Sequence, residues 1–412
     1  MQNPPKIQSQ PVPFATTGKV LIAGGGIGGV TAALCLAKVG FEVAVFERAP
    51  EFGEIGAGLQ LSPNCTRVLH HLGLAEALKA CSFVPDGTEF RVWKSGRVVG
   101  GMTLGQSAHE TYGFPYYHIH RADLHRVLVD AARQCPAIGL YCACEVTDFA
   151  QDASGVRLAA AGVTHTGDVL IGADGIHSRV RAGLLGDQAP DFTGNVAWRM
   201  LVPTERLPKG LIRPMATVWW GPGKHFLHYY VRCGALVNCT CVVEKSGWEV
   251  ESWTEPGEYD ELKRDFAGWH SDVQTLIDSA DRDSLFKWAL FDRRPMPRWS
   301  EGAVALLGDA CHPTLPFMAQ GAAMAIEDAA VLAGCLSTGS DTTAALERYA
   351  ALRRRRTAWI QNGSRRNAEF FHLRGIKAWL RNRGSRRASG SIMDSLFRYD
   401  ALAATDSINT PT

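Results

Sequence analysis

One glycine-rich turn near the start of the chain, Gly24-Gly-Gly26-Ile-Gly28-Gly29, constrains the fold more than any other segment. A β-like run, Lys19–Ala23, precedes the turn, and an Ala- and Leu-rich run follows it at 30–39. In the spacing Gly24-x-Gly26-x-x-Gly29, the first glycine permits a tight turn, the second lets the backbone approach a pyrophosphate, and the third lets a helix pack closely on a strand. The pattern predicts a βα unit whose helix N-terminus faces phosphates.

The next strand-like run, Glu42–Glu47, supplies an acidic side chain where a dinucleotide site needs one. Glu47 follows Gly29 by 18 residues, and a carboxylate at about that distance can accept hydrogen bonds from a ribose diol. The same charge would repel a 2′-phosphate, so FAD or NAD is expected here rather than NADP. A glycine-rich turn that binds nothing is the alternative, and it leaves the acid unexplained.

The uncharged run at 20–37 is 18 residues long, which raises the question of a membrane span. Its glycines and its strand-like start favour a strand–turn–helix in a soluble protein instead. Residues 1–18 hold four prolines and resemble a flexible leader rather than a signal peptide. A net charge of +2 favours neither a nucleic acid nor a membrane as partner.

Eleven cysteines, an odd number in a long chain, indicate reduced thiols and a cytoplasmic protein rather than a disulfide scaffold. Cys142-x-Cys144 and Cys239-x-Cys241 have the alternation of strands and lack the spacing of a zinc site. No metal is therefore expected. Runs of basic residues at 353–356, 365–366 and 386–387 are expected to form a solvated helix face, with a homodimer contact as the alternative.

The pattern of residue types along the chain changes twice. Between about 190 and 294, aromatic and β-branched runs at 217–220, 225–231 and 236–243 predict a mostly antiparallel sheet. A strand at 303–307 and a helix from about Gly321 to Leu336 then return to the opening pattern. The fold class is α/β, or α+β overall, and the first domain is expected to be discontinuous.

Two later motifs each end a predicted strand: Gly172-Ala-Asp174-Gly175 and Gly308-Asp309-Ala-Cys-His312-Pro313. With the glycine-rich turn they stand in the order GxGxxG, DG, GD. From about residue 19 to 350 the chain resembles the single-component FAD-dependent aromatic hydroxylases. The similarity extends to the branch of salicylate hydroxylases, 3-hydroxybenzoate 6-hydroxylases and 6-hydroxynicotinate 3-monooxygenases.

The resemblance implies a Rossmann-like FAD-binding domain and an antiparallel substrate domain, as in p-hydroxybenzoate-hydroxylase-like flavoproteins. The expected division is a leader at 1–18, an FAD-binding domain at 19–85, 110–188 and 296–375, a substrate domain at 86–109 and 189–295, and a C-terminal helical tail at 376–412.

The resemblance also assigns cofactor contacts. Asp309 would hold the ribityl chain, Asp174 would support the pyrophosphate and nicotinamide binding, and Arg121 would contact FAD. The N-terminus of the helix at Gly321 would face the flavin ring and stabilise its anionic reduced form. Further positions that the resemblance places at the cofactor are Gly28, Arg48, Gly58, Val146 and Ala322.

The reaction implied by the resemblance uses FAD, O2 and transient NADH or NADPH. A flavin C4a-hydroperoxide would hydroxylate a phenolic or hydroxypyridine carboxylate of the salicylate, 3-hydroxybenzoate or 6-hydroxynicotinate class, with decarboxylation as an open variant. Two alternatives stay open: a hydroxylase of another, urate-like heteroaromatic compound, and a non-hydroxylating flavoprotein on the same fold.

Strand alternation places His225 and Tyr229 on one face of a predicted strand. The pair resembles the His-x-x-x-Tyr pair of the 3-hydroxybenzoate and 6-hydroxynicotinate branch, so His225 is the expected base and Tyr229 an orienting hydrogen-bond partner. The resemblance adds Gln60, in Gly56-Ala-Gly58-Leu-Gln60, and Pro316 to the catalytic site. The sequence departs from the relatives at two positions, because Gln60 and Phe317 stand where they tend to carry histidine. These differences predict a more apolar surface over the substrate ring. Arg199 and Arg213 are conceivable partners for a substrate carboxylate.

Overall fold

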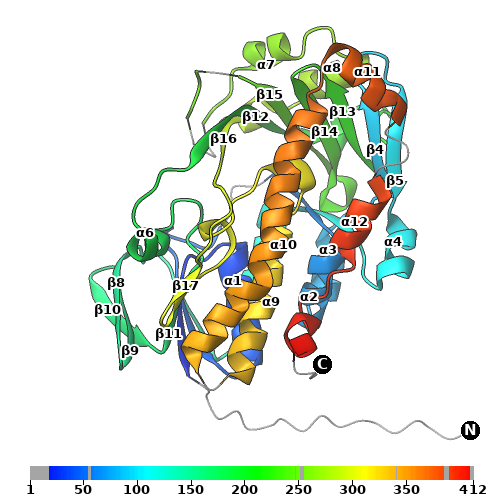
Figure 1. Cartoon of the computed structure of the whole chain (residues 1–412). Coiled ribbons are helices and arrows are strands. Elements are labelled where there is room, and N and C mark those ends of the chain that lie inside the picture. The colour runs from blue at the N-terminus through cyan, green and yellow to red at the C-terminus, as the bar shows by residue number, and fades with distance from the viewer. Residues whose placement is uncertain are drawn as a thin grey trace, which may run out of the picture.

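The structure is a computed structural model that describes residues 18–53, 57–245, 247–250, 255–339, 341–384 and 389–408. Residues 1–17 of the expected leader, Gly56 and the basic pair at 386–387 lie outside the described residues. Figure 1 shows a lower half around one sheet and an upper half around another, with the long helix α10 (Thr342–Phe371) running along both.

The lower half contains a six-stranded sheet with the order β17-β18-β11-β1-β2-β7. Its strands are parallel except for the β17–β18 pair. The central strands are buried Val, Ile, Leu and Ala runs because helices cover both faces of a parallel sheet. The strands are β1 (Lys19–Ala23), β2 (Glu42–Phe46), β7 (Ile138–Tyr141), β11 (Val169–Gly172), β17 (Ser300–Glu301) and β18 (Val304–Leu306).

Three helices hold the turns of this sheet in place. Helix α1 (Ile27–Lys38) begins three residues earlier than the expected 30, α5 (Arg121–Arg133) follows strand β6 (Tyr117–His120), and α9 (Gly321–Thr338) begins where predicted. By length and composition α9 could cross a membrane, but 72% of it is buried inside the fold, where it packs on α1 and α10. It is a core helix.

The upper half contains a seven-stranded sheet with the order β16-β12-β15-β14-β13-β4-β5. All neighbouring strands of this sheet are antiparallel except β13 and β4, which confirms the prediction of a mostly antiparallel sheet. The strands are β4 (Gly87–Val92), β5 (Val98–Thr103), β12 (Asp191–Pro203), β13 (Met215–Gly221), β14 (Lys224–Val231), β15 (Leu236–Glu244) and β16 (Phe286–Asp292).

The two faces of this sheet have different neighbours. The outer face packs against α7 (Tyr259–Asp265) and α8 (Ser271–Asp278), for example through Phe226 and Phe266. The inner face packs against the loop before α9 and against α10, through Leu315 and Phe317. Inner-face side chains therefore meet the segments of the lower half that carry the GD motif.

Smaller elements complete the fold. A two-stranded sheet of β3 (Gly58–Leu61) and β6 (Tyr117–His120) lies against β14, and a three-stranded sheet flanks the six-stranded one. The remaining elements are α2 (Pro63–His71), α3 (Ala75–Cys81), α4 (Gly105–Tyr112), β8 (Val146–Asp152), β9 (Gly155–Ala160), β10 (Val163–Gly167), α6 (Arg179–Leu185), α11 (Gly375–Gly384) and α12 (Ser389–Phe397).

Candidate functional site

The glycine-rich turn has no room for side chains. Gly24 has φ +102°, and a Cβ there would lie 2.4 Å from the carbonyl oxygen of Ala173. A Cβ on Gly29 would lie 2.0 Å from the oxygen of Gly24. Gly26 is the N-cap of α1, so the free N–H groups of the first helical turn point out of the turn. The backbone forms the cradle that a pyrophosphate needs.

Glu47 closes one end of this cradle. Its carboxylate accepts hydrogen bonds from the backbone N–H of Gly25 at 2.8 Å and of Ala49 at 2.9 Å. Each carboxylate oxygen has a second lone pair, so the group can still accept hydrogen bonds from a ribose. Arg48, the next residue, is exposed. The backbone N–H of Cys144 donates to the backbone oxygen of Glu47, and Val146 begins β8 two residues later. Glu47, Arg48 and Val146 therefore lie near the same end of the cradle.

Asp174 organises its own loop. It accepts hydrogen bonds from the Ser178 hydroxyl at 2.5 Å and from the backbone N–H of Arg179 at 2.7 Å, at the start of α6. Burial raises the pKa of Asp174, although these hydrogen bonds oppose the rise. Gly175, at φ +80°, has open space where a side chain would lie. The DG motif is a preformed turn beside the cradle.

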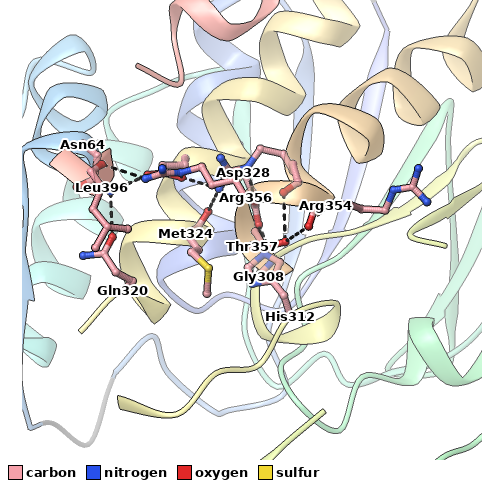
Figure 2. A network of polar contacts seen from close by, with 12 residues as sticks. Asn64, Gly308, His312, Gln320, Met324, Asp328, Arg354, Arg356, Thr357 and Leu396 are labelled. Carbon is pink, nitrogen blue, oxygen red and sulfur yellow. Dashed lines mark hydrogen bonds and ion pairs between the residues drawn. The ribbon is translucent and has the colours of Figure 1, made fainter. Parts of the chain in front are cut away.

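Asp309 lies in the GD turn and is exposed, whereas Gly308 and Ala310 on either side are buried. The turn is held from behind by Asp328 of α9. The Asp328 carboxylate accepts from the Gly308 N–H at 3.2 Å and contacts Nε2 of His312 at 2.5 Å. Figure 2 shows these contacts around Asp328. The GD turn therefore presents Asp309 outward from a fixed backbone.

Two arginines of α10 complete this network, which corrects one expectation. Arg353 is fully buried and lies 2.7 Å from both Glu327 and Asp328, and Arg356 bonds Glu327. These members of the basic run are not a solvated helix face. Their charges are matched by two acids of α9, which the sequence places in an otherwise apolar helix. Arg354 and Arg355 are exposed, as expected.

The charges in this cluster stabilise one another. Burial alone would raise the pKa of Asp328, but His312 and Arg353 outweigh it and lower that pKa to about 2. Glu327 follows the same pattern, with Arg353 and Arg356 lowering its pKa against the effect of burial. The sulfur of Cys311 also lies within 4.8 Å of the ligand atoms of His312 and Asp328. Because Asp328 is already ion-paired, these contacts act as a brace for the GD turn.

The loop before α9 carries the predicted flavin-facing residues. Pro316 begins a short 3-10 turn, Ala319 adopts φ +51°, and Gly321 and Ala322 open the helix. The N-cap Gln320 is fixed by Ser62 and Asn64, which bond its side chain at 3.0 and 3.1 Å. The N–H groups of the first turn have no partner within the helix, so this end carries a partial positive charge toward the loop.

The predicted catalytic pair faces this loop. His225 and Tyr229 lie on the inner face of β14, as the alternation predicted, while Phe226 points to α7. The His225 ring lies 5.1 Å from the ring of Phe317. The Tyr229 ring lies 4.5 Å from His118, and a Cβ on Gly58 would lie 2.8 Å from the Tyr229 oxygen. The pair therefore spans the space from the loop to β3.

Burial sets the protonation of both groups. It lowers the pKa of His225 well below its ordinary value, with a further decrease from His372, so the imidazole is neutral near pH 7. It raises the pKa of Tyr229, so the phenol keeps its proton. The face thus offers a neutral base and a hydrogen-bond donor.

Gln60, on β3, accepts a hydrogen bond from the Tyr116 hydroxyl at 2.6 Å, close to His118. Arg199 is buried on β12 over the rings of Phe286 and Trp288. Burial, together with Arg121, lowers the pKa of Arg199 to about 10.

Arg213 is different. It is more than half exposed and bonds Glu89 at 2.7 Å. It is thus already paired with a carboxylate of its own chain.

Several residues of this region carry no motif. His372 bonds His225 at 3.0 Å, and Asn238 accepts from the N–H of Gly58 at 2.7 Å. His118 packs on Tyr229 with both ring nitrogens buried and without a partner among the described residues. Each reaches the face from a distant segment, and no local sequence signal marks them.

These features fit FAD. The glycine cradle excludes side chains, Asp309 is exposed within a buried segment, and the start of α9 presents free N–H groups. The family model described as FAD binding domain matches residues 17–363. The structure of HpxO from Klebsiella pneumoniae complexed with FAD and uric acid has a TM-score of 0.81 at 28% identity, over 93% of this chain and 97% of that one.

Curated relatives agree in length and kind. 3-Amino-4-hydroxybenzoate 2-monooxygenase PtnB3 of Streptomyces platensis is 40% identical, over 89% of this chain and 91% of its own. 3-Hydroxybenzoate 6-hydroxylase 1 of Aquipseudomonas alcaligenes is 38% identical, over 88% and 92%. 6-Hydroxynicotinate 3-monooxygenase of Pseudomonas fluorescens is 38% identical, over 85% and 91%. The structure of a salicylate hydroxylase substrate complex has a TM-score of 0.79 at 29% identity, over 96% and 98%.

Proposed function

The chain belongs to the FAD binding domain family, as an FAD-dependent aromatic-ring monooxygenase, and we propose that it hydroxylates a phenolic aromatic or hydroxypyridine carboxylate. The observation that carries this proposal is the position of His225. A neutral, buried histidine faces the loop before α9 across Phe317, at the point where substrate and flavin would meet.

For the cofactor we propose that the cradle of Gly24, Gly26 and Gly29 takes the pyrophosphate and that Glu47 accepts from the ribose. Asp309 would bind the ribityl chain, and the first turn of α9 would face the flavin ring. The contacts described above support these roles. Further contacts are proposed for Gly28, Arg48, Gly58, Arg121, Val146, Asp174, Gly321 and Ala322.

At the substrate we propose that His225 removes the proton of the ring hydroxyl and that Tyr229 orients the ring by a hydrogen bond. A base in hydrogen-bond reach of a phenol contributes about 10²–10⁴-fold to rate. Gln60 and Pro316 would border the same pocket, and Phe317 would keep water from His225. Arg199, buried on β12 over the rings of Phe286 and Trp288, is the proposed partner of the substrate carboxylate.

Bound FAD supplies the redox chemistry that links a nicotinamide to O2. The proposed overall reaction takes a hydride from NADH or NADPH and one proton from water, places one oxygen atom on the ring, and releases the other as water. A deprotonated hydroxyl makes the ring electron-rich, which is what His225 provides.

The wider assignments are also proposals. The FAD-binding domain would comprise 19–85, 110–188 and 296–375, the substrate domain 86–109 and 189–295, and the C-terminal tail 376–412. The protein would work in the cytoplasm, where eleven free cysteines stay reduced, and a homodimer is the alternative to a monomer. A urate-like substrate is the second candidate, supported by the structural similarity to the complex with uric acid.

The test is a panel of 3-amino-4-hydroxybenzoate, 3-hydroxybenzoate, 6-hydroxynicotinate, salicylate and urate, each scored for NADH and NADPH oxidation and for hydroxylated product. We expect one carboxylated phenol or hydroxypyridine to stimulate oxidation and yield product. His225→Gln should keep bound FAD and lose product by about 10²-fold or more. If urate alone gave product, the substrate would be a urate-like heteroaromatic compound and not a phenolic or hydroxypyridine carboxylate. Full activity of His225→Gln would show that His225 is not the base.

A further inference from the structure

His225 is the first member of a line of three side chains that leads to the surface. Its Nδ1 lies 3.0 Å from Nε2 of His372, and Nδ1 of His372 lies 3.2 Å from a carboxylate oxygen of Glu244. The two histidines are 4% and 3% exposed, whereas the Glu244 side chain is 42% exposed. The line begins on the inner face of β14 and ends in water.

We propose that His225, His372 and Glu244 form a proton path that carries the phenolic proton of the substrate to solvent. The path rests on the proposed function, which places the ring hydroxyl at His225. It assigns a role to two residues, His372 and Glu244, that lie outside every motif of the chain.

The end of the path determines its direction. An ionised carboxylate only accepts hydrogen bonds, so Glu244 favours the tautomer of His372 with a proton on Nδ1. The other nitrogen of His372 then accepts, which places a proton on Nδ1 of His225. Nε2 of His225 is left as a lone pair, which is the form that a base requires.

Transfer along this line is balanced. The substrate O–H bond breaks as an N–H bond forms at Nε2 of His225. The proton on Nδ1 of His225 moves to Nε2 of His372, and the proton on Nδ1 of His372 moves to the Glu244 carboxylate. Glu244 then releases its proton to water, and both rings hold their proton on Nε2. The first tautomers return when the product phenolate takes the proton from Nε2 of His225, because each step then runs in reverse and Glu244 takes one proton from water.

The backbone around His372 keeps the line in place. The N–H of Gly223 donates to the oxygen of His372 at 3.0 Å. Arg381, almost fully buried, donates to the oxygens of Phe370 and Phe371 at 2.8 and 2.7 Å, which closes the end of α10. The His372 ring therefore has a fixed neighbour on each side.

Aromatic rings shield the inner part of the line from water. Phe317 and Phe371 lie 5.1 and 5.4 Å from the His225 ring. At the outer end, Glu244 lines a surface cleft with a volume of about 490 Å³, together with Gly223, Lys224 and Arg374. The outer end of the line is thus the part that meets water.

The charges near the path come from three elements: Lys224 on β14, Glu244 on β15, and Arg374 and Arg381 in the α11 segment. Arg374 bonds Glu244 at 2.6 Å, and Arg374 and Arg381 of the α11 segment both lower the pKa of His372. Burial is the largest effect and lowers that pKa to about 4, although Glu244 opposes it. Neither imidazole therefore keeps a second proton, and both rings stay neutral before and after the transfer.

The test measures proton release on binding, without turnover. Oxidised FAD-loaded enzyme is mixed with 3-amino-4-hydroxybenzoate, or with 3-hydroxybenzoate, in weakly buffered solution containing a pH-indicator dye, and the phenolate absorbance is followed in parallel. We expect His372→Gln and Glu244→Gln to slow both signals by about tenfold or more, with FAD still bound. Glu205→Gln and His109→Gln, at exposed positions, are the controls and should match the wild type.

The outcomes separate the two proposals. Wild-type rates of proton release in both His372→Gln and Glu244→Gln would overturn the path while leaving His225 as base. A wild-type enzyme that forms no phenolate with either probe and shows no product in the substrate panel would overturn the proposed function itself. Because the Glu244 side chain is 42% exposed, its variant tests the path even if His372→Gln fails to fold.

Discussion

One buried histidine, His312, lies within the segment that joins β18 to α9, and another, His225, packs against that segment; their surroundings are opposite. His312 contacts Asp328, which is ion-paired with Arg353, and all three side chains are at most 1% exposed. His225 contacts His372, which contacts the half-exposed Glu244. We call the first group the closed cluster and the second the open cluster.

The difference shows how one kind of residue can serve two purposes. In the closed cluster, buried cations match buried carboxylates, which lowers the pKa of Asp328 to about 2 and keeps the charges in place. In the open cluster, no buried cation pairs with His225 among the described contacts, and burial keeps the ring neutral. Closed charge balance braces a turn, whereas a neutral line with an exposed end can exchange protons.

The largest effect should come from opening the closed cluster. Arg353→Met leaves Asp328 and Glu327 buried without their shared partner, and removing one member of a buried ion pair costs about 3–5 kcal/mol. Urea unfolding of the FAD-loaded protein measures this loss. Arg355→Met, an exposed position on the same helix, should change the free energy of unfolding by less than about 0.5 kcal/mol. Equal losses in the two variants would show that the cluster is not a brace.

The closed cluster should also give a defined pH dependence. The pKa of Asp328 is lowered from 3.8 to about 2 in the folded protein, so its contribution is present above the ordinary pKa and is lost as the pH falls toward 2. Asp328→Asn should therefore be less stable than wild type by about 2 kcal/mol at pH 6, and the gap should narrow between pH 4 and 2. A gap that stays constant over that range would contradict the ion pairing.

The open cluster should respond to a loss of shielding. Phe317→Leu removes a ring contact with His225 worth about 1 kcal/mol and lets water closer. The pKa of His225 should then rise toward its ordinary value, which moves the acidic limb of the hydroxylation pH profile to higher pH, because a base must be neutral. Phe192→Leu, which loses a ring contact with Phe291, is the matched control. If the pH profile of hydroxylation in Phe317→Leu matched that of the wild type, Phe317 would not be what lowers the pKa of His225.

The smallest effect is expected at the exposed end of the open cluster. Arg374 bonds Glu244 in a pair whose side chains are 65% and 42% exposed, and such pairs contribute about 0–1 kcal/mol. Arg374→Gln should therefore cost less than about 1 kcal/mol in the urea experiment used for Arg353→Met. A loss as large as that of Arg353→Met would erase the contrast between the clusters.

The lower half of the fold could be predicted because its constraints are local. The strand at Lys19–Ala23 and the helix start at Gly321 agree with the structure, since a tight turn and a helix N-terminus depend on neighbouring residues. Helix α1 was expected at 30 and begins at Ile27, because Gly28 and Gly29 lie inside its first turn. Glycine is a poor guide to helix boundaries.

In the upper half, contacts between residues far apart in the sequence could not be predicted. Alternation predicted that His225 and Tyr229 share a face, but His372 meets His225 across 147 residues of chain. Only the packing of α10 against the sheet brings them together. The burial of Arg353 could not be predicted either, because its partners Glu327 and Asp328 lie on another helix. Contacts between distant segments leave no periodic signal.

The proposed function requires that this site place an oxygen atom from O2 on a phenolic ring. Mass spectrometry of the product formed under 18O2, with the substrate that stimulates NADH or NADPH oxidation, tests it most directly. We expect one 18O atom in each product molecule from the wild type and loss of labelled product in His225→Gln. Nicotinamide oxidation that yields hydrogen peroxide alone, or product that carries oxygen from water, would contradict it.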